Sequence, residues 1–185
     1  METMMPKYLI AVFLLAATAA SAAPPTINMR LLEAHNIARK AVGAAPLIWS
    51  DALAKDARGW AHKLAQTGQF EHAPQPKGAG AQGENLWMGT VFAYSPEDMI
   101  GAWTAEKQYY RRGPFPKVST TGAWSDVGHY TQMIWHSTTH VGCAIARSEG
   151  DEYLVCRYSP PGNWIGQDPQ GSATLTKQNI RKKSR

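Results

Sequence analysis

Three of the six histidines in this 185-residue sequence lie close together, in the stretch GHYTQMIWHSTTH. Neutral imidazole binds zinc and other transition metals, and it can also transfer protons near neutral pH. His136 and His140 are four residues apart and would meet on a helix, but HSTTH lacks the glutamate of the metalloprotease motif HExxH. We therefore expect His136 and His140 to be exposed surface residues. The spacing alone assigns no role to His129.

A glutamate, Glu106, stands where a helix would carry an apolar residue. It shares a helical stripe with Met99, Trp103 and Tyr110, at the spacing i, i+4, i+7 and i+11. A carboxylate on a buried face needs a partner or a function, whereas one at the edge of the stripe would reach water. The residues alone leave both interpretations open.

Two further side chains raise a similar question. Glu84, in GENLW, lies between a Gly/Pro-rich segment and an apolar one, and His72, in FEHAP, follows closely after a predicted helix. Together with Glu106 and His129 they form no local metal-binding motif. His35 differs, because it lies within the apolar stripe of a predicted helix, and we interpret it as a hydrogen-bonded core histidine.

Three helices are expected to position these residues. The first spans about residues 27–40. The second runs from a capping serine, Ser50, to a terminating glycine, Gly68, and the third runs from the capping Ser95 to Gly113.

Two short strands, VGCAIA and EYLVCRY, are separated by RSEGDE and predict a β-hairpin. This arrangement would bring Cys143 and Cys156 within reach of a disulfide. Such a bond would close a loop of about fourteen residues and contribute about 3 kcal/mol, whereas two free buried thiols are the alternative. Helices combined with a small antiparallel sheet indicate an α+β fold.

The two ends of the chain differ in composition from its middle. Residues 1–22 have a lysine, an apolar run and a final Ala-Ser-Ala, which predicts a signal peptide and a secreted or periplasmic protein; a membrane anchor is the alternative. Residues 23–168 suit a single domain. The net charge of +5 comes from residues 169–185, an expected disordered basic tail that could contact an anionic membrane or polysaccharide. The body shows no basic binding motif, so we expect no nucleic-acid partner.

Two longer motifs resemble a known family. GHYTQMIWHST and YLVCRYSPPGNW match the signature motifs of the CAP superfamily, which groups cysteine-rich secretory proteins, antigen 5 and plant pathogenesis-related 1 proteins. The segments AHNIARK, GENLW and WTAEKQYY also follow the family order, so the resemblance covers residues 31–164. It implies an α-β-α sandwich in which a small antiparallel sheet lies between helices.

The resemblance also implies a wide cleft with two histidines and two glutamates. The matching positions here are His72, Glu84, Glu106 and His129. Two neutral imidazoles with carboxylates suit zinc or another divalent cation. In the family the histidines are the usual direct ligands, and the glutamates act through water or from behind the histidines.

Several family members bind sterols or fatty acids, some of them through an aromatic-rich loop before the first signature. The corresponding segment here is YYRRGPFPKVSTTGAW, which offers Tyr110, Phe115, Val118 and Trp124 to a sterol, a fatty acid or another apolar ligand. The alternative is that these side chains fold back onto the core.

The sequence thus favours a secreted, non-enzymatic ligand-binding module with a role in defence or in interaction with other molecules. The alternative is a metal-dependent hydrolase, in which Glu84 and Glu106 would be the catalytic candidates. No serine or cysteine nucleophile with a recognisable base supports that alternative. The sequence does not indicate an oligomeric state.

Overall fold

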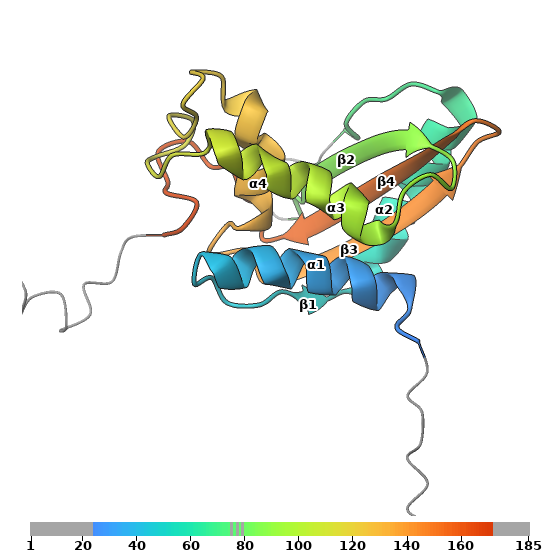
Figure 1. The fold of residues 1–185 in the computed structure, drawn as a ribbon, viewed down its shortest axis with the longest axis horizontal. Coiled ribbons are helices and arrows are strands. Elements are labelled where there is room, and N and C mark those ends of the chain that lie inside the picture. The colour runs from blue at the N-terminus through green and yellow to red at the C-terminus, as the bar shows by residue number, and fades with distance from the viewer. Residues whose placement is uncertain (1–23, 75, 77, 79, 172–185) are drawn as a thin grey trace, which may run out of the picture.

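A four-stranded sheet with helices on both faces forms the centre of the computed structural model, which describes residues 24–74, 76, 78 and 80–171 (Figure 1). This mixed architecture confirms the predicted α+β class. The helices are α1 (Ile27–Ala41), α2 (Asp51–Thr67), α3 (Pro96–Ala105) and α4 (Gly128–Met133), with 3-10 turns η1 (Glu106–Tyr109) and η2 (Trp124–Val127). The strands are β1 (Ile48–Trp49), β2 (Gly83–Thr90), β3 (His140–Arg147) and β4 (Asp151–Ser159).

The predicted hairpin forms the centre of the sheet. β3 and β4 pair antiparallel with Cys143 opposite Cys156, and the two sulfurs form the predicted disulfide. β2 pairs antiparallel with the other side of β4, whereas β1 pairs parallel with β3, so the order is β1-β3-β4-β2. The sequence analysis placed neither β1 nor β2. β2 lies at the edge of this sheet.

Buried apolar side chains alternate between the two faces of the sheet, so a hydrophobic core lies on each face. On β4, Leu154 and Tyr158 pack with residues of α1, α3 and α4, while Tyr153 and Val155 pack against α2. Successive side chains of a strand point to opposite faces, which is why one strand serves both cores. Figure 1 shows the resulting layers, with α2 behind the sheet and the other helices in front. This is the α-β-α sandwich that the resemblance implied.

Capping fixes where the helices begin. The hydroxyl of Ser50 accepts a hydrogen bond from the backbone N–H of Leu53, and Ser95 accepts one from Asp98. Gly68 ends α2 in the left-handed conformation, with φ 68°, which glycine adopts without a steric penalty. These two starts and this end agree with the sequence-based expectation.

The predicted end of the third helix is wrong. α3 stops at Ala105 rather than at Gly113, and the chain tightens into η1. Tyr110 then forms an isolated antiparallel bridge with Ser119, so the segment turns back on itself before it reaches the glycine. Glu106 consequently lies at the C-cap of α3 and begins η1, instead of occupying a helical stripe.

A buried arginine ties α1 to the end of α4. The side chain of Arg39 is fully buried, and burial lowers its pKa to about 10, so it remains cationic at neutral pH. Backbone carbonyls surround its guanidinium: those of Ala45, Met133, Trp135 and Thr138. One of these carbonyls precedes β1, one belongs to the last residue of α4, and two lie in the segment after α4. The arginine therefore helps to hold the end of α4 in place.

The last described residues of the chain, up to Gly171, are bonded to the folded body. The predicted signal peptide and residues 172–185 of the predicted basic tail lie outside the described residues. The carbonyl of Pro169 accepts a hydrogen bond from the backbone N–H of His136 at 2.7 Å, and that of Gly171 accepts one from Arg112 at 2.7 Å. The folded body therefore extends to Gly171, beyond the predicted end of the domain.

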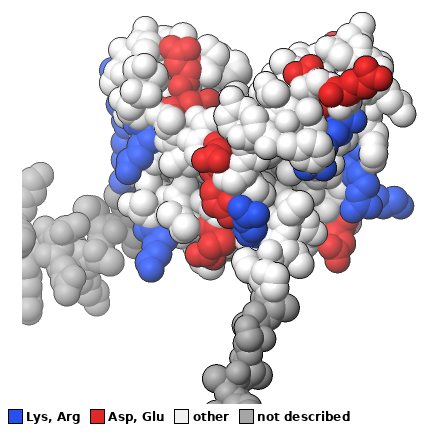
Figure 2. Space-filling view, turned by 45° about the vertical axis from the view of Figure 1, so that its right-hand side comes forward, with Lys and Arg blue, Asp and Glu red and all other residues white. Residues whose placement is uncertain are grey.

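Charged side chains of both signs are interspersed on the face shown in Figure 2. The described residues on that face form no large area of a single charge sign. As for apolar segments, none of the helices in the described ranges combines the length and the hydropathy needed to cross a bilayer.

Candidate functional site

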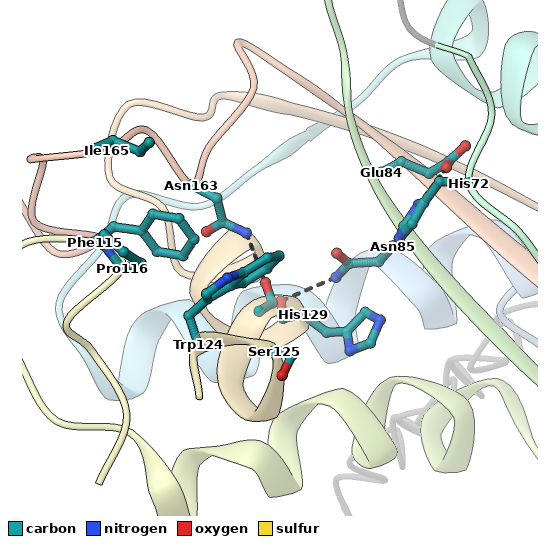
Figure 3. A pocket seen from close by; sticks show the side chains of 11 residues that line it. His72, Glu84, Asn85, Phe115, Pro116, Trp124, Ser125, His129, Asn163 and Ile165 are labelled. Atoms are coloured by element: carbon teal, nitrogen blue, oxygen red, sulfur yellow. Dashed lines mark hydrogen bonds and ion pairs between the residues drawn. The ribbon is translucent and has the colours of Figure 1, made fainter. Parts of the chain in front are cut away.

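A pocket of about 520 Å³ opens beside the edge strand β2, as Figure 3 shows. Its lining combines a polar side and an apolar side, contributed by segments far apart in the sequence. The lining residues are His72, Glu84, Asn85, Phe115, Pro116, Trp124, Ser125, Gly128, His129, Asn163 and Ile165.

The first histidine of the pocket is oriented by a glutamate. Nδ1 of His72 lies 2.6 Å from Oε1 of Glu84, which also accepts a hydrogen bond from the backbone N–H of Ala73 at 3.0 Å. His72 is exposed, with 63% of its side chain accessible, whereas the Glu84 side chain is only 4% accessible. A carboxylate accepts the Nδ1 proton, so the Nε2 of neutral His72 carries a lone pair.

The other oxygen of Glu84 has a cationic neighbour. Oε2 lies 2.8 Å from Nη2 of Arg157, and both side chains are almost fully buried. This contact is an ion pair that lacks the alignment of a hydrogen bond, since Oε2 has no hydrogen-bond partner within the described ranges. Register explains the pairing, because Glu84 on β2 lies directly opposite Arg157 on β4. The guanidinium offsets the charge of the carboxylate.

The second histidine has a matching arrangement on the other side of the pocket. Nδ1 of His129, on α4, lies 2.6 Å from Oε1 of Glu106, and Oε2 of Glu106 accepts a hydrogen bond from the backbone N–H of Tyr130 at 2.9 Å. The indole of Trp103 stacks on the imidazole with an interplanar angle of 12°. Stacking and hydrogen bonding together fix the ring of His129. Of the two interpretations left open for Glu106, a partnered carboxylate is the one that the structure shows.

The four residues form two pairs rather than one compact cluster. Within the described residues, the single group of three or more possible ligands with atoms within 4.8 Å of one another is His35, Cys143 and Cys156. That group cannot hold a metal, because the cysteines form the disulfide and both ring nitrogens of His35 are hydrogen-bonded. The donor set that suits a divalent cation is the pair of imidazole Nε2 atoms that line the pocket.

The loop suggested for ligand binding is divided between core and pocket. Phe115 and Trp124 line the pocket, and their rings meet edge to face with centroids 5.4 Å apart. Val118 is fully buried with Val127 and Trp135 in a third apolar cluster, on which Tyr110 packs. Phe115, which is only 6% exposed, belongs to the same cluster. Val118, Phe115 and Tyr110 therefore pack onto the core, as the alternative interpretation expected, whereas Trp124 is half exposed.

Five side chains of the pocket were not among the residues singled out from the sequence: Asn85, Pro116, Ser125, Asn163 and Ile165. Asn85 follows Glu84 directly, whereas Asn163 and Ile165 come from the Pro/Gly-rich loop after β4. No periodicity marks such positions, because a loop has no repeating face. The motif GENLW does contain Asn85, and an amide beside a candidate ligand was the available signal.

A comparison with protein families decides the classification. Residues 32–158 match the family CAP, described as the Cysteine-rich secretory protein family. The chain belongs to this family. The match covers the elements from α1 to β4, so the CAP domain contains all four residues of the two histidine–glutamate pairs.

Curated relatives of this CAP domain include plant proteins named as pathogenesis-related. Pathogenesis-related protein 1C of Nicotiana tabacum is 39% identical over 140 residues, which cover 75% of this chain and 77% of the relative. A pathogenesis-related protein of PR-1 type from Sambucus nigra is 35% identical over 139 residues, covering 75% and 78%. The relationship extends over most of both chains.

Solved structures show the same architecture. The crystal structure of NaASP2 with Zn2+ has a TM-score of 0.61 and 28% sequence identity to this CAP protein, covering 76% of this chain and 82% of that one. The structure of BmVAL-1 has a TM-score of 0.63 at 23% identity, covering 80% and 82%. At that identity, the second likeness supports the fold alone.

Proposed function

We propose that this CAP protein is a secreted, non-enzymatic binding module whose cleft holds a divalent cation through His72 and His129. One observation carries the proposal: both imidazoles line the same pocket, and each has its Nδ1 engaged by a glutamate. A histidine that donates its Nδ1 proton to a carboxylate has a more basic Nε2, and this is the usual second partner of metal-binding histidines. A bound divalent cation would supply a concentrated positive charge in the cleft.

The charges around the two pairs favour a cation on the side of His129. The negative charge of Glu84 is offset by Arg157, whereas Glu106 is hydrogen-bonded to a neutral backbone amide and to His129. The negative charge of Glu106 therefore has no arginine or lysine partner among the ion pairs of the described residues. An uncompensated carboxylate behind an imidazole attracts a cation to the open side of the ring.

Binding is favoured over hydrolysis because the carboxylates of both glutamates are engaged by neighbouring groups in this structure. The oxygens of Glu84 contact His72, Ala73 and Arg157, and those of Glu106 contact His129 and Tyr130. A general base must reach the attacking water within hydrogen-bond distance.

The apolar side of the pocket supports the binding of an apolar ligand in addition to the cation. Phe115, Pro116, Trp124 and Ile165 lie together there, and the Trp124 and Ile165 side chains are exposed. A sterol or a fatty acid could place its apolar part against them. The pathogenesis-related names of the relatives support a role in defence, and the family's description as secretory, together with the disulfide, supports export of this chain.

Zinc titration with thermal unfolding tests the metal site. Zinc at about one hundred times its dissociation constant should stabilise the wild-type protein by about 2.7 kcal/mol. His72→Ala or His129→Ala should remove most of that gain, whereas His62→Ala, at an exposed position of α2, should keep it. An absent wild-type response, or a full response in both cleft variants, would contradict the metal site. The solved NaASP2 structure with Zn2+ is the relative that makes zinc the first metal to try.

A pair of tryptophan variants tests the apolar side. Trp124 and Trp164 are both 50% exposed, but only Trp124 lines the pocket. Trp124→Ala should weaken binding of a soluble sterol derivative or a fatty acid, measured by calorimetry, by about tenfold, since a large aromatic contact is lost. Trp164→Ala should leave the affinity unchanged. Equal affinities for both variants would show that the ligand docks elsewhere.

A further inference from the structure

An amide side chain between the two histidine–glutamate pairs has no role so far. Asn85 is 1% exposed and follows Glu84 on the edge strand β2, so the two side chains leave the strand on opposite faces. In Figure 3 the Asn85 amide lies between His72 and the backbone of His129. A buried amide is costly unless its polar atoms are paired or serve a ligand.

A buried chain of hydrogen bonds fixes which way this amide points. Nδ1 of His35 lies 2.8 Å from the carbonyl of Leu31, which can only accept, so this nitrogen carries the proton. Nε2 of His35 must then accept from the hydroxyl of Tyr158, 2.8 Å away. The Tyr158 oxygen, having used its proton, accepts from Nδ2 of Asn85 at 3.1 Å.

A second contact gives the same orientation independently. The carbonyl of His129, which can only accept, lies 3.1 Å from Nδ2 of Asn85. The two protons of the amide nitrogen are thus taken by Tyr158 and by the backbone of His129. Oδ1 of Asn85 has no hydrogen-bond partner within the described part of the chain, and this residue lines the pocket.

We propose that Oδ1 of Asn85 is a third binding atom of the cleft, and that Tyr158 and His35 are positioning residues that hold it. The inference rests on the proposed function, because the bound species is the divalent cation with its water. The cleft would then present two imidazole Nε2 atoms and one amide oxygen, all of which accept hydrogen bonds or donate lone pairs. Such a set takes a hydrated divalent cation and disfavours a free anion.

Oδ1 of Asn85 should contribute most to the affinity for cations that prefer oxygen ligands. Carbonyl oxygens suit manganese and magnesium better than zinc, which binds strongly to imidazole. Asn85 could instead act only by holding α4 in place through its hydrogen bond to the His129 backbone. Its loss would then lower the affinity for all cations by the same factor, since every cation would bind to His129. The ratio of manganese to zinc affinity therefore separates a binding atom from a brace.

Calorimetric titration of the full mature chain with zinc and with manganese tests this assignment. Asn85→Ala should lower the zinc affinity by about tenfold, the cost typical of losing a supporting group, and it should lower the manganese affinity by more. Tyr158→Phe, which leaves the cleft untouched but removes the hydrogen bond that orients the amide, should lower both affinities by less, and that for manganese again more than that for zinc. Gln66→Ala, which removes an exposed amide of α2 outside the pocket lining, is the matched control and should change neither.

Three outcomes would overturn the inference. Unchanged affinities in Asn85→Ala, with a wild-type chain that binds zinc, would remove Asn85 and leave the histidine site standing. Equal losses for zinc and manganese would reduce Asn85 to a structural brace. A wild-type chain that binds neither metal would remove the proposed function, and this inference with it. Should Asn85→Ala not fold, Tyr158→Phe gives the same discrimination from outside the pocket.

Discussion

The surroundings of each histidine determine what it can do. His72 and His129 each face a carboxylate and a pocket, whereas His35 is enclosed between a backbone carbonyl and a tyrosine. His136 and His140 are exposed, as expected from the missing glutamate in HSTTH. Identical side chains therefore differ in which ring nitrogen is free, because their partners differ.

The buried His35 should make stability depend on pH. Desolvation is the main cause that lowers its pKa from 6.5 to about 4, helped by the nearby charge of Arg39 and opposed by the hydrogen bond to Leu31. In the unfolded chain the imidazole titrates near 6.5, so between about pH 6.5 and 4 only the unfolded state takes up the proton. The stabilisation is complete above pH 6.5 and is lost as the pH falls towards 4, by an amount on the order of 3 kcal/mol.

Chemical unfolding of the wild type and of His35→Gln, measured from pH 7.5 to 5, checks this dependence. The free energy of unfolding of the wild type should fall more steeply than that of the variant, which has no titrating group at this position. Parallel curves would mean that His35 does not titrate differently in the two states.

The hairpin pattern predicted the pairing of Cys143 with Cys156, which form a disulfide in the structure. The family resemblance pointed to His72, Glu84, Glu106 and His129, but not to their grouping into two hydrogen-bonded pairs, and their role in binding stays a prediction. Asn85 could not be assigned from the sequence, because its orientation depends on Tyr158, a residue far along the chain. Such long-range hydrogen bonds leave no periodic signal.

At the scale of elements, β3 and the start of α2 approach closely at a glycine. A Cβ added to Gly142 would lie 2.3 Å from the backbone nitrogen of Ala54 and 2.4 Å from the carbonyl of Ser50. Backbone atoms cannot move away cheaply, so overpacking should follow.

Two glycine variants test that packing. Gly142→Ala should lower the free energy of unfolding by about 1–3 kcal/mol. Gly59→Ala, on the exposed face of α2 where an added Cβ meets nothing within 4 Å, should raise it by about 1 kcal/mol through helix propensity. Urea unfolding measures both changes. A neutral Gly142→Ala would show that α2 can move away from the sheet.

Element boundaries were predicted accurately where local chemistry sets them. Ser50, Gly68 and Ser95 act through neighbouring backbone groups, so their roles are visible in the sequence. The end of α3 depends instead on the bridge from Tyr110 to Ser119, which no local pattern encodes. β2 was missed because its strand, GENLWMGT, carries polar residues that serve the cleft.

At the scale of the whole molecule, the cleft exists because distant segments converge on one edge of the sheet. The loop after α2 brings His72, β2 brings Glu84, and α4 brings His129, with Arg39 holding α4 in place. The residue patterns predicted the α+β class, whereas the α-β-α order of layers was implied by the family resemblance. The pocket could be placed only through the family resemblance.

Truncation after Gly171 tests how far the folded body extends. The removed residues carry few apolar side chains, so the melting temperature should change little. Truncation after Asp168 should lower it, because the bonds from Pro169 and Gly171 to the body are lost. Thermal unfolding of both truncated chains measures the difference. A large loss on the first truncation would contradict this boundary.

The most direct test of the metal site is a long-range proton–nitrogen NMR spectrum of the histidine side chains, recorded with and without zinc. We expect the Nε2 signals of His72 and His129 to shift on zinc addition while their Nδ1 atoms stay protonated by the glutamate contacts. His35 should keep its proton on Nδ1 throughout and serve as the internal reference. Zinc shifts confined to His62, His136 and His140, or no shifts at all, would contradict the account.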